Sequence, residues 1–368
     1  NDILKSNFIG YDNYSIRSNI DAKVNENIKV GLNFAMRSEN SNMPSMGTTS
    51  IFHTMWRNYP FLLARNPDGS FAPGIERGEN PLVMGTEEAG YNKTRDNLYQ
   101  TTFTYEVNIP WVRGLSVDGF VANDKNYSFN KLFRKPWMVY EYNPDEDTYS
   151  SRVGGSVTSP QLTQTQGHYN RTTLNLRLKY DWEYKNHFVN AFVAVEQTET
   201  NGNSFWAQRK NYITSAIDEL FAGGATDKDN SGSAYETARQ NLFGRVSYNL
   251  KETYLIDFNF RYDGSQNFPK EKRFGFFPGF SVGWRLSEES FLEDVDILDE
   301  LKLRGSWGQM GNDQISSFQY LSTYSFGTSY RFANPTTTVI RGTSPNLNIT
   351  WEIAQTMNLG ANLSMWRG

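Results

Sequence analysis

The sequence predicts an all-β protein, specifically a transmembrane antiparallel β-barrel of which this chain supplies a part. Three observations predict it. Apolar and polar residues alternate along segments of about ten residues, the length that a tilted strand needs to cross a bilayer. Short turns join these segments in pairs. Long segments rich in Gly, Asn, Ser, Pro and aromatic residues separate the pairs, a rhythm typical of outer-membrane barrels.

The first pair of segments shows the alternation most clearly. Residues 28–36 read Ile-Lys-Val-Gly-Leu-Asn-Phe-Ala-Met, with most even positions apolar and most odd positions polar or small. The preceding segment keeps the same parity from Tyr14 to Val24, and Asn25-Glu26-Asn27 forms a tight turn between the two. Alternation on both sides of a turn predicts a β-hairpin with one apolar and one polar face.

Four further hairpins and a final strand follow. The hairpins pair 97–108 with 115–124, 169–183 with 188–198, 242–250 with 254–263, and 276–286 with 301–309; the final strand covers 349–366. The acidic segment 287–300, inside the last hairpin, is expected to form one or two helical turns. The segments expected to be long extracellular loops are 39–96, 125–168, 199–241, 264–275 and 310–348.

The composition is compatible with such a barrel and excludes several other classes. The 368 residues have a mean hydropathy of −0.63, and no apolar run is long enough for a membrane helix. Aromatic residues make up 15% of the chain and cluster near the short turns, as expected for the girdles at a lipid boundary. Cysteine is absent, histidines number three, and the net charge of −4 gives no reason to expect nucleic acid.

The termini and the motif content add two expectations. The chain begins at Asn1 without Met or a signal sequence, so we expect an excerpt of a longer protein. It contains no nucleophile elbow, no metalloprotease motif and no phosphate-binding loop, and its histidines lie in turns or loops. We therefore expect no enzyme activity.

An ordered series of motifs between residues 242 and 312 identifies a family. It reads Leu-Phe-Gly-Arg-Val-Ser-Tyr at 242–248, Phe-Arg-Tyr-Asp-Gly-Ser at 260–265, Phe-Phe-Pro-Gly-Phe-Ser-Val-Gly-Trp-Arg at 276–285, and Leu-Lys-Leu-Arg-Gly-Ser-Trp-Gly-Gln at 301–309. Gly311-Asn312 completes it. The series resembles the barrel of SusC/RagA-type TonB-dependent transporters of Bacteroidetes outer membranes.

This resemblance implies the organisation of the complete protein. It implies a barrel of about 22 strands, of which residues 1–368 would be roughly the middle half, within a single barrel domain. The N-terminal plug and the C-terminal strands would be absent from this chain. The protein would lie in the outer membrane, contact TonB through the plug, and carry a SusD-like lipoprotein as a lid. Its function would be TonB-dependent import of a glycan or an oligopeptide.

Charged residues on the polar parity of the strands are candidates for the inner wall. A cation facing lipid near the midplane would cost about 2–4 kcal/mol, so these side chains should face the lumen. Two roles remain open: ion pairs and contacts with the plug, or a substrate path exposed when the plug moves. The candidates are Arg245, Arg261, Asp263, Arg285 and Arg304.

Aromatic residues in the long loops are candidates for ligand contact. Trp56, Tyr59 and Phe61 lie in the first loop, followed by Pro67-Asp68-Gly69-Ser70, and Trp206 lies in the third. Above a barrel mouth, exposed rings could stack on sugars or hold peptide side chains. They could equally pack against the lid or against each other.

The segment from Asp227 to Gly232 resembles the first half of a calcium loop. Asp227, Asp229 and Ser231 place oxygen donors at alternate positions, with Gly at the sixth. The twelfth position is Ala238, where a bidentate Glu is needed. We therefore expect no cofactor, with calcium at Asp227 and Asp229 as a weak candidate beside a plain surface loop.

Two other classes of protein share parts of this pattern. A passive porin or a surface adhesin would show the same hairpins without a plug. A soluble carbohydrate-binding β-protein would show alternating strands and loop aromatics, but it does not account for the ordered motifs.

Overall fold

The computed structural model describes residues 8–292, 297–331 and 334–366 of the chain. One large antiparallel sheet dominates it. Its eleven strands are β1 (Gly10–Lys23), β2 (Ile28–Pro44), β3 (Gly90–Asn108), β4 (Leu115–Arg134), β7 (Gln161–Tyr184), β8 (His187–Arg209), β9 (Lys228–Leu250), β10 (Tyr254–Ser265), β11 (Phe274–Arg285), β12 (Leu298–Asn312) and β15 (Glu352–Met365).

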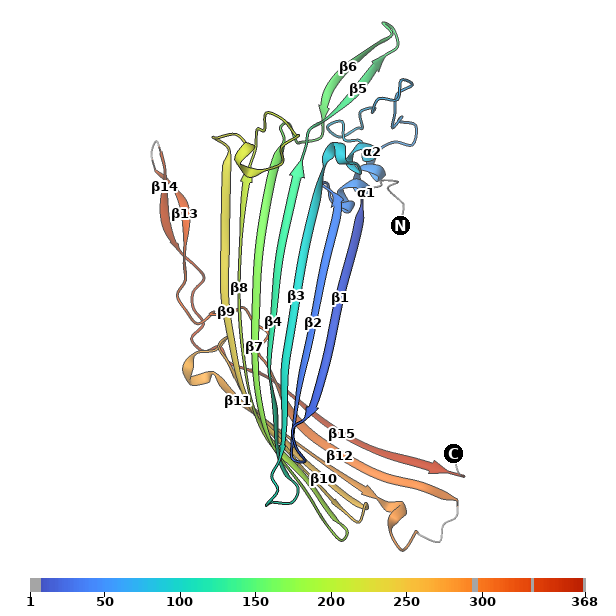
Figure 1. Ribbon diagram of the computed structural model, residues 1–368, viewed down its shortest axis with the longest axis vertical. Coiled ribbons are helices and arrows are strands. Elements are labelled where there is room, and N and C mark those ends of the chain that lie inside the picture. The colour runs from blue at the N-terminus through green and yellow to red at the C-terminus, as the bar shows by residue number, and fades with distance from the viewer. Residues whose placement is uncertain (1–7, 293–296, 332–333, 367–368) are drawn as a thin grey trace.

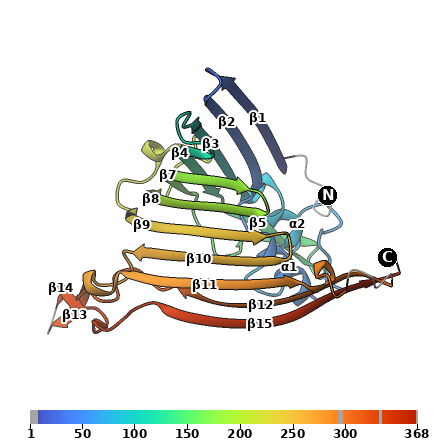
Figure 2. The ribbon, with the colours of Figure 1, turned by 90° about the horizontal axis from the view of Figure 1, so that it is seen from below.

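Smaller elements lie in the loops. They are the hairpins β5 (Trp137–Asn143) with β6 (Thr148–Gly154) and β13 (Tyr324–Arg331) with β14 (Asn334–Arg341), the helices α1 (Thr48–Arg57) and α2 (Pro81–Met84), and the 3₁₀ turns η1 (Glu87–Ala89), η2 (Leu220–Ala222), η3 (Lys270–Lys272) and η4 (Leu286–Glu288). The strands of the large sheet are neighbours in chain order, and the sheet curls into an open trough (Figures 1 and 2).

The five hairpins predicted from the sequence are all present, with the predicted partners. The predicted strand lengths are wrong, because several strands continue far into segments that were expected to be loops. β7 has 24 residues, and β8 and β9 have 23 each. These extensions are polar on both faces, so they carry no alternation, yet their backbone ladders continue without interruption.

The acidic segment after β11 also differs from its prediction. One short 3₁₀ turn, η4, replaces the expected helical turns, and β12 begins at Leu298. The part of the segment at 293–296 lies outside the described residues. The predicted final strand pairs with β12, with one irregularity between Leu298 and Glu300.

The register aligns apolar residues from all eleven strands on one face. For example, Phe258 of β10 lies opposite Val246 of β9 and Phe280 of β11, and Phe280 lies opposite Trp307 of β12. We call this band of exposed apolar side chains the apolar belt. Each strand contributes at least one member, and in the order of the strands these are Ile16, Leu32, Phe103, Val121, Leu176, Val195, Leu242, Phe258, Phe280, Leu303 and Leu359.

The apolar belt lies on the convex side of the sheet. The loop at 210–227 packs Tyr212 and Leu220 against Phe133 of β4 and Leu162 of β7, which have the same parity as the belt. Figure 2 shows this loop, in yellow-green, outside the curve of the sheet, whereas α1 and α2 lie on the side toward which the sheet curls. The polar parity therefore faces the concave side.

The two ends of the sheet differ in the way the sequence predicts. The hairpin turns lie together at one end, and the long loops with α1, α2 and the β5–β6 hairpin lie at the other (Figure 1). Aromatic rings of belt parity stack near the turns: Trp182 on Tyr184, and Tyr254 on Trp284. Within the described ranges, no helix has the length and apolar character needed to cross a membrane.

Candidate functional site

The concave wall carries ion pairs that join neighbouring strands. Arg245 of β9 contacts Asp257 of β10 at 2.6 Å, and the hydroxyl of Ser247 donates a hydrogen bond to the same carboxylate. On β10 itself, Arg261 donates two hydrogen bonds to Asp263, at 2.8 and 2.9 Å. The register thus brings Arg245 to Asp257 across two strands, and the two-residue spacing along β10 brings the predicted residues Arg261 and Asp263 together on the same face.

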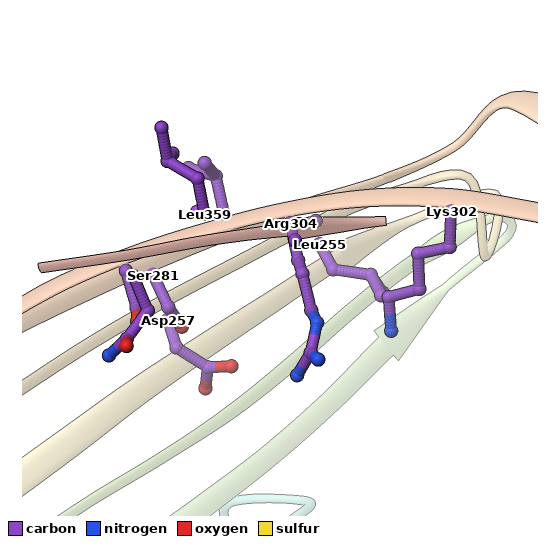
Figure 3. Close-up of a pocket in the computed structure, with 12 residues that line it drawn as sticks. Leu255, Asp257, Ser281, Lys302, Arg304 and Leu359 are labelled. Atoms are coloured by element: carbon purple, nitrogen blue, oxygen red, sulfur yellow. The ribbon is translucent and has the colours of Figure 1, made fainter. Parts of the chain in front are cut away.

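Arg304 occupies a different setting on this wall. Its neighbours in the register are Gly283 of β11 and Gly360 of β15, so no side chain flanks it on either side. The result is a hollow of about 520 Å³ that Asp257 and Lys302 also line. Figure 3 shows Arg304 and Asp257 pointing to one side of the sheet and Leu359 of the apolar belt pointing to the other.

Arg285 has the same parity but lies at the turn end of the wall. Its guanidinium contacts Glu288 of η4 at 2.9 Å and Glu252 of the preceding turn at 3.8 Å. Arg285 therefore links two neighbouring turns. Its parity predicted a position on the inner face, but not this structural role.

A second charged cluster on the concave wall was not singled out from the sequence. Arg177 of β7 forms a two-pronged contact with Asp118 of β4, with Nε at 3.0 and 3.1 Å and Nη2 at 2.8 Å. Lys29 pairs with Glu106 at 3.4 Å nearby. These pairs cross strands that are far apart in the sequence, so only the register reveals them. They line a hollow of about 630 Å³.

The first loop folds over the concave side as a small unit with its own core. Ile51 of α1, Val83 and Met84 of α2, and Trp137 and Val139 of β5 form one buried cluster. The loop was expected to be irregular. Its core escaped detection because these apolar residues are scattered over almost ninety positions of the chain, without a period that marks one element.

One buried amide organises this unit. Asn80 donates from Nδ2 to the carbonyl oxygens of Ala64 and Ala72 at 2.7 and 2.8 Å. Its Oδ1 accepts a hydrogen bond from the backbone N–H of Leu82 at 2.9 Å, which caps α2. One side chain therefore fixes two segments of the loop and the start of α2. Such buried polar groups are costly to lose because their partners remain unsatisfied.

The predicted aromatic residues of this loop lie on its surface. Trp56 is 91% exposed on α1, and Phe61 is 78% exposed. The rings of Tyr59 and Phe61 stack, with centroids 5.3 Å apart. Tyr59 also lines an apolar groove of about 370 Å³. The structure thus brings Tyr59 and Phe61 together, as a surface that an apolar or ring-shaped group could contact.

Two further predicted features of the loops have clear positions. Trp206 lies on β8 with concave parity, half-buried, between Thr165 of β7 and Ser231 of β9 in the register. In the turn at 67–70, Ser70 donates from its backbone N–H and its hydroxyl to Asp68. These hydrogen bonds favour the charged carboxylate and lower the pKa of Asp68 from its usual value.

The segment proposed as a calcium loop has an extended conformation. β9 begins at Lys228 and pairs with β8 from its first residue, so no twelve-residue loop is formed. Asp227 accepts hydrogen bonds from Asn211 and Thr226. In the described part of the chain, no group of three or more His, Cys, Asp or Glu side chains has the arrangement that a metal ion needs. Calcium binding stays an unsupported prediction.

Comparison with known sequences finds one family over nearly the whole chain. The family described as TonB dependent receptor-like, beta-barrel matches residues 15–368. TonB-dependent receptor P3 of Formosa agariphila is 25% identical over 380 residues, covering 99% of this chain and 35% of that protein. TonB-dependent receptor SusC of Bacteroides thetaiotaomicron is 37% identical over 142 residues, covering 37% of this chain and 14% of SusC.

Comparison with solved structures finds the same architecture. The RagAB peptide importer in its "closed-closed" state has a TM-score of 0.78 and 18% identity, covering 97% of this chain and 39% of that chain. Its "open-open" state has the same TM-score at 17% identity. At these identities the likeness concerns the fold. The chain spans about a third of the length of the curated relatives that it matches end to end.

Proposed function

This chain belongs to the family of TonB dependent receptor-like β-barrels, and from that premise we propose that the complete protein actively imports a glycan or an oligopeptide. The chain is part of an outer-membrane barrel. The observation that carries the proposal is the division of the sheet into two faces, an unbroken apolar belt outside and a charged wall inside. In a barrel of this kind the outer face contacts lipid and the inner face encloses the transport path.

The inner wall supplies the surface against which a plug would rest. Arg245 and Arg261 are held by acids in the wall itself. Arg304 and Lys302 form no ion pair within the described ranges, and they line the hollow beside Gly283 and Gly360. We propose that the paired residues maintain the wall and that Arg304 contacts the plug. A substrate path would run along this wall after TonB displaces the plug.

The exposed aromatic surface of the first loop suits capture of the substrate. Trp56, Tyr59 and Phe61 lie on the unit that covers the concave side, and we propose that they contact substrate together with Trp206. A SusD-like lipoprotein would close over the same loops. Support for an oligopeptide comes from the printed description of RagAB as a peptide importer, and support for a glycan comes from the aromatic rings that suit sugar stacking.

Uptake measurements on the full-length protein test this function. Cells would be supplied with labelled oligosaccharides or oligopeptides, with and without the gene, and with and without TonB. The proposal expects uptake of one class that requires both genes. Uptake that persists without TonB would indicate passive diffusion instead. Co-purification with a surface lipoprotein would test the partner.

A pair of substitutions tests the capture surface. Trp56→Ala should weaken binding of the imported substrate by about three- to tenfold, the effect of losing one aromatic contact. The matched control is Trp111→Ala, which removes a similarly exposed ring (82%) at the opposite end of the sheet. Equal binding by the wild type and the Trp56 variant would remove Trp56 from the site.

A further inference from the structure

A group of cations lies on the convex face just beyond the apolar belt. Lys93 and Arg95 on β3 have the parity of Phe103, and Lys125 on β4 has the parity of Val121. All three side chains are exposed. They form the outer-wall cation patch. Side chains of this parity face away from the transport path, so the patch has no part in the proposed import.

The aromatic residues around the patch place it at the lipid boundary. Lys125 lies opposite Tyr99 in the register, and the rings of Tyr99 and Tyr127 meet edge to face at 6.3 Å. Tyr127 in turn packs against His168 at 4.9 Å. A belt of amphipathic rings is typical of the boundary between hydrocarbon and headgroups, and this one lies at the end of the sheet that carries the long loops.

The spacing along β3 sets the height of the other two cations. Arg95 and Lys93 lie four and six residues beyond Tyr99. At about 3.4 Å per residue these steps are roughly 14 and 20 Å along the strand. A strand tilt of about 40° reduces them to roughly 10 and 15 Å above the aromatic ring of Tyr99. Lys125 therefore lies at the edge of the hydrocarbon, and Arg95 and Lys93 lie in the headgroup layer.

Two members of the patch, Lys93 and Arg95, line a groove of about 500 Å³ on the convex face, and Lys125 lies below it at the level of Tyr99. Lys93, Arg95, Phe129 and Lys131 line it, together with Asp12 of β1 and residues of β2. The loop at 210–227 closes its upper end. There Lys131 contacts Asp218 and Glu219 at 3.2 and 3.0 Å, and Tyr91 donates a hydrogen bond to Asp218. The groove thus opens toward the lipid side, below a fixed rim.

The charge of the patch is only partly balanced by the protein, since Asp12 is the one acid among the described residues that line the groove beside Lys93 and Arg95. Among the residues that the structure describes, Lys93, Arg95 and Lys125 form no ion pair. Lys93 lies over the ring of Tyr91 at 4.3 Å, and Arg95 donates from Nε to Asn40 at 3.1 Å. These contacts orient both side chains and leave their charges available, because neither contact involves an anion.

We propose that this groove binds the phosphate-bearing headgroup of an outer-leaflet lipid. Three points select this occupant: two cations in the groove that form no ion pair with the described residues and a third below it, interleaved aromatic rings at the hydrocarbon edge, and a groove that faces the bilayer. Lys and Arg are the side chains that recognise phosphate, Arg through two parallel hydrogen bonds. Basic pockets at the level of lipid headgroups bind anionic lipids for the same reason. The acyl chains of the lipid lie along Tyr99, Tyr127 and the apolar belt.

The test measures lipid binding by the full-length protein in detergent. A phosphorylated glycolipid purified from the outer membrane of the producing organism is titrated against the protein, and bound lipid is counted by native mass spectrometry. The triple variant Lys93→Ala, Arg95→Ala, Lys125→Ala should bind about 100-fold more weakly, at roughly fivefold per cation. Lys93→Arg with Lys125→Arg should bind as the wild type does.

The control removes the same charge from the concave face. Arg17, Lys23 and Lys29 have the opposite parity on β1 and β2, so replacing them with Ala should leave lipid binding unchanged. The proposal is overturned if the two triple variants bind alike, or if the wild type binds the enzymatically dephosphorylated glycolipid equally well. Displacement of the lipid by an equimolar amount of inorganic phosphate would also overturn it, since a free anion would then be the ligand. Uptake assays report separately on import.

Discussion

The two faces of β11 give the most direct test of the barrel orientation. Phe280 and Ser281 are neighbours on this strand with opposite parity. Phe280 lies midway between Phe276 and Trp284, so it should face the centre of the hydrocarbon layer. Its cross-strand neighbours are Phe258 and Trp307. Replacing Phe280 with Arg places a charge there.

The expected cost follows from this position. An Arg on the lipid face of a barrel costs about 2–4 kcal/mol at the midplane. Loss of the aromatic pair with Phe258 adds about 0.2–1 kcal/mol. The sum is about 2–5 kcal/mol, a factor of roughly 30 or more in the folding equilibrium. Ser281→Arg introduces the same charge on the concave face, opposite Asp257 and beside a hollow of about 520 Å³. That variant should change stability by less than about 1 kcal/mol.

The assay compares the two variants of the full-length protein. Folded barrels in outer-membrane fractions are quantified by their heat-dependent migration in gels, and purified protein is unfolded by denaturant in detergent. Phe280→Arg should lower both the folded fraction and the unfolding midpoint, and Ser281→Arg should lower neither. The reverse order of the two variants would refute the orientation, and with it the transport path along the polar wall.

Three further substitutions test the loops and the wall. Asn80→Ala should destabilise the first loop by about 1–3 kcal/mol, since three hydrogen-bond partners lose their buried amide; proteolysis within this loop, with the barrel intact, would report it. Phe133→Ala should cost about 3–5 kcal/mol of packing energy and raise the rate of amide hydrogen exchange in residues 210–227. An unchanged exchange rate would show that contact with Phe133 does not hold this loop in place. Arg261→Glu should replace the ion pair with repulsion between the introduced carboxylate and Asp263 and reduce barrel assembly or uptake. Arg261→Lys should retain normal assembly and uptake. Normal assembly and uptake in the Arg261→Glu variant would exclude both a structural role and a transport role for Arg261.

The sequence predicted the parts of the strands whose outer face contacts lipid. Alternation is strict where one face meets hydrocarbon, as from Leu174 to Trp182 on β7, and there the strands and their hairpin partners were predicted correctly. Above this level neither face of β7 meets hydrocarbon, and Leu162 is covered by the loop at 210–227. Residues 161–168 read Gln-Leu-Thr-Gln-Thr-Gln-Gly-His, which has no apolar period, although the ladder to β4 and β8 continues through it. Backbone hydrogen bonds extend the strand here, and they do not depend on the hydropathy of the side chains, so the hydropathy pattern could not predict this part of β7.

The difference between strands that contact lipid and strands that do not also explains why the family was predicted correctly and the ion pairs of the wall were predicted only in part. The motifs at 242–312 lie in the lipid-constrained strands, and the family inferred from them is confirmed. The polar parity of Arg245 and Arg261 was visible for the same reason. The acid partner of Arg245 depends on register and rotamer, and the pairing of Arg177 with Asp118 joins residues 59 positions apart. No local pattern encodes such a pair.

The segment that resembles a calcium loop has a different conformation in the structure, and calcium binding by it stays an untested prediction. Oxygen donors at alternate positions converge on an ion when the chain turns, as in a calcium loop. In a strand the same spacing places Asp229 and Ser231 on one face, about 7 Å apart along a straight line. The two conformations share a spacing, and the sequence alone did not distinguish between them.

The independent core of the first loop has a consequence for how such proteins diversify. Ile51, Val83, Met84 and their partners are buried among themselves and against β5, not against the strands of the large sheet. Selection can therefore remodel the outward surface around Trp56 and Phe61 while the ancestral scaffold below keeps its pairing and its stability. The surface of this loop unit and the pairing of the strands below it are thus separate features of the structure, and a change in one need not alter the other.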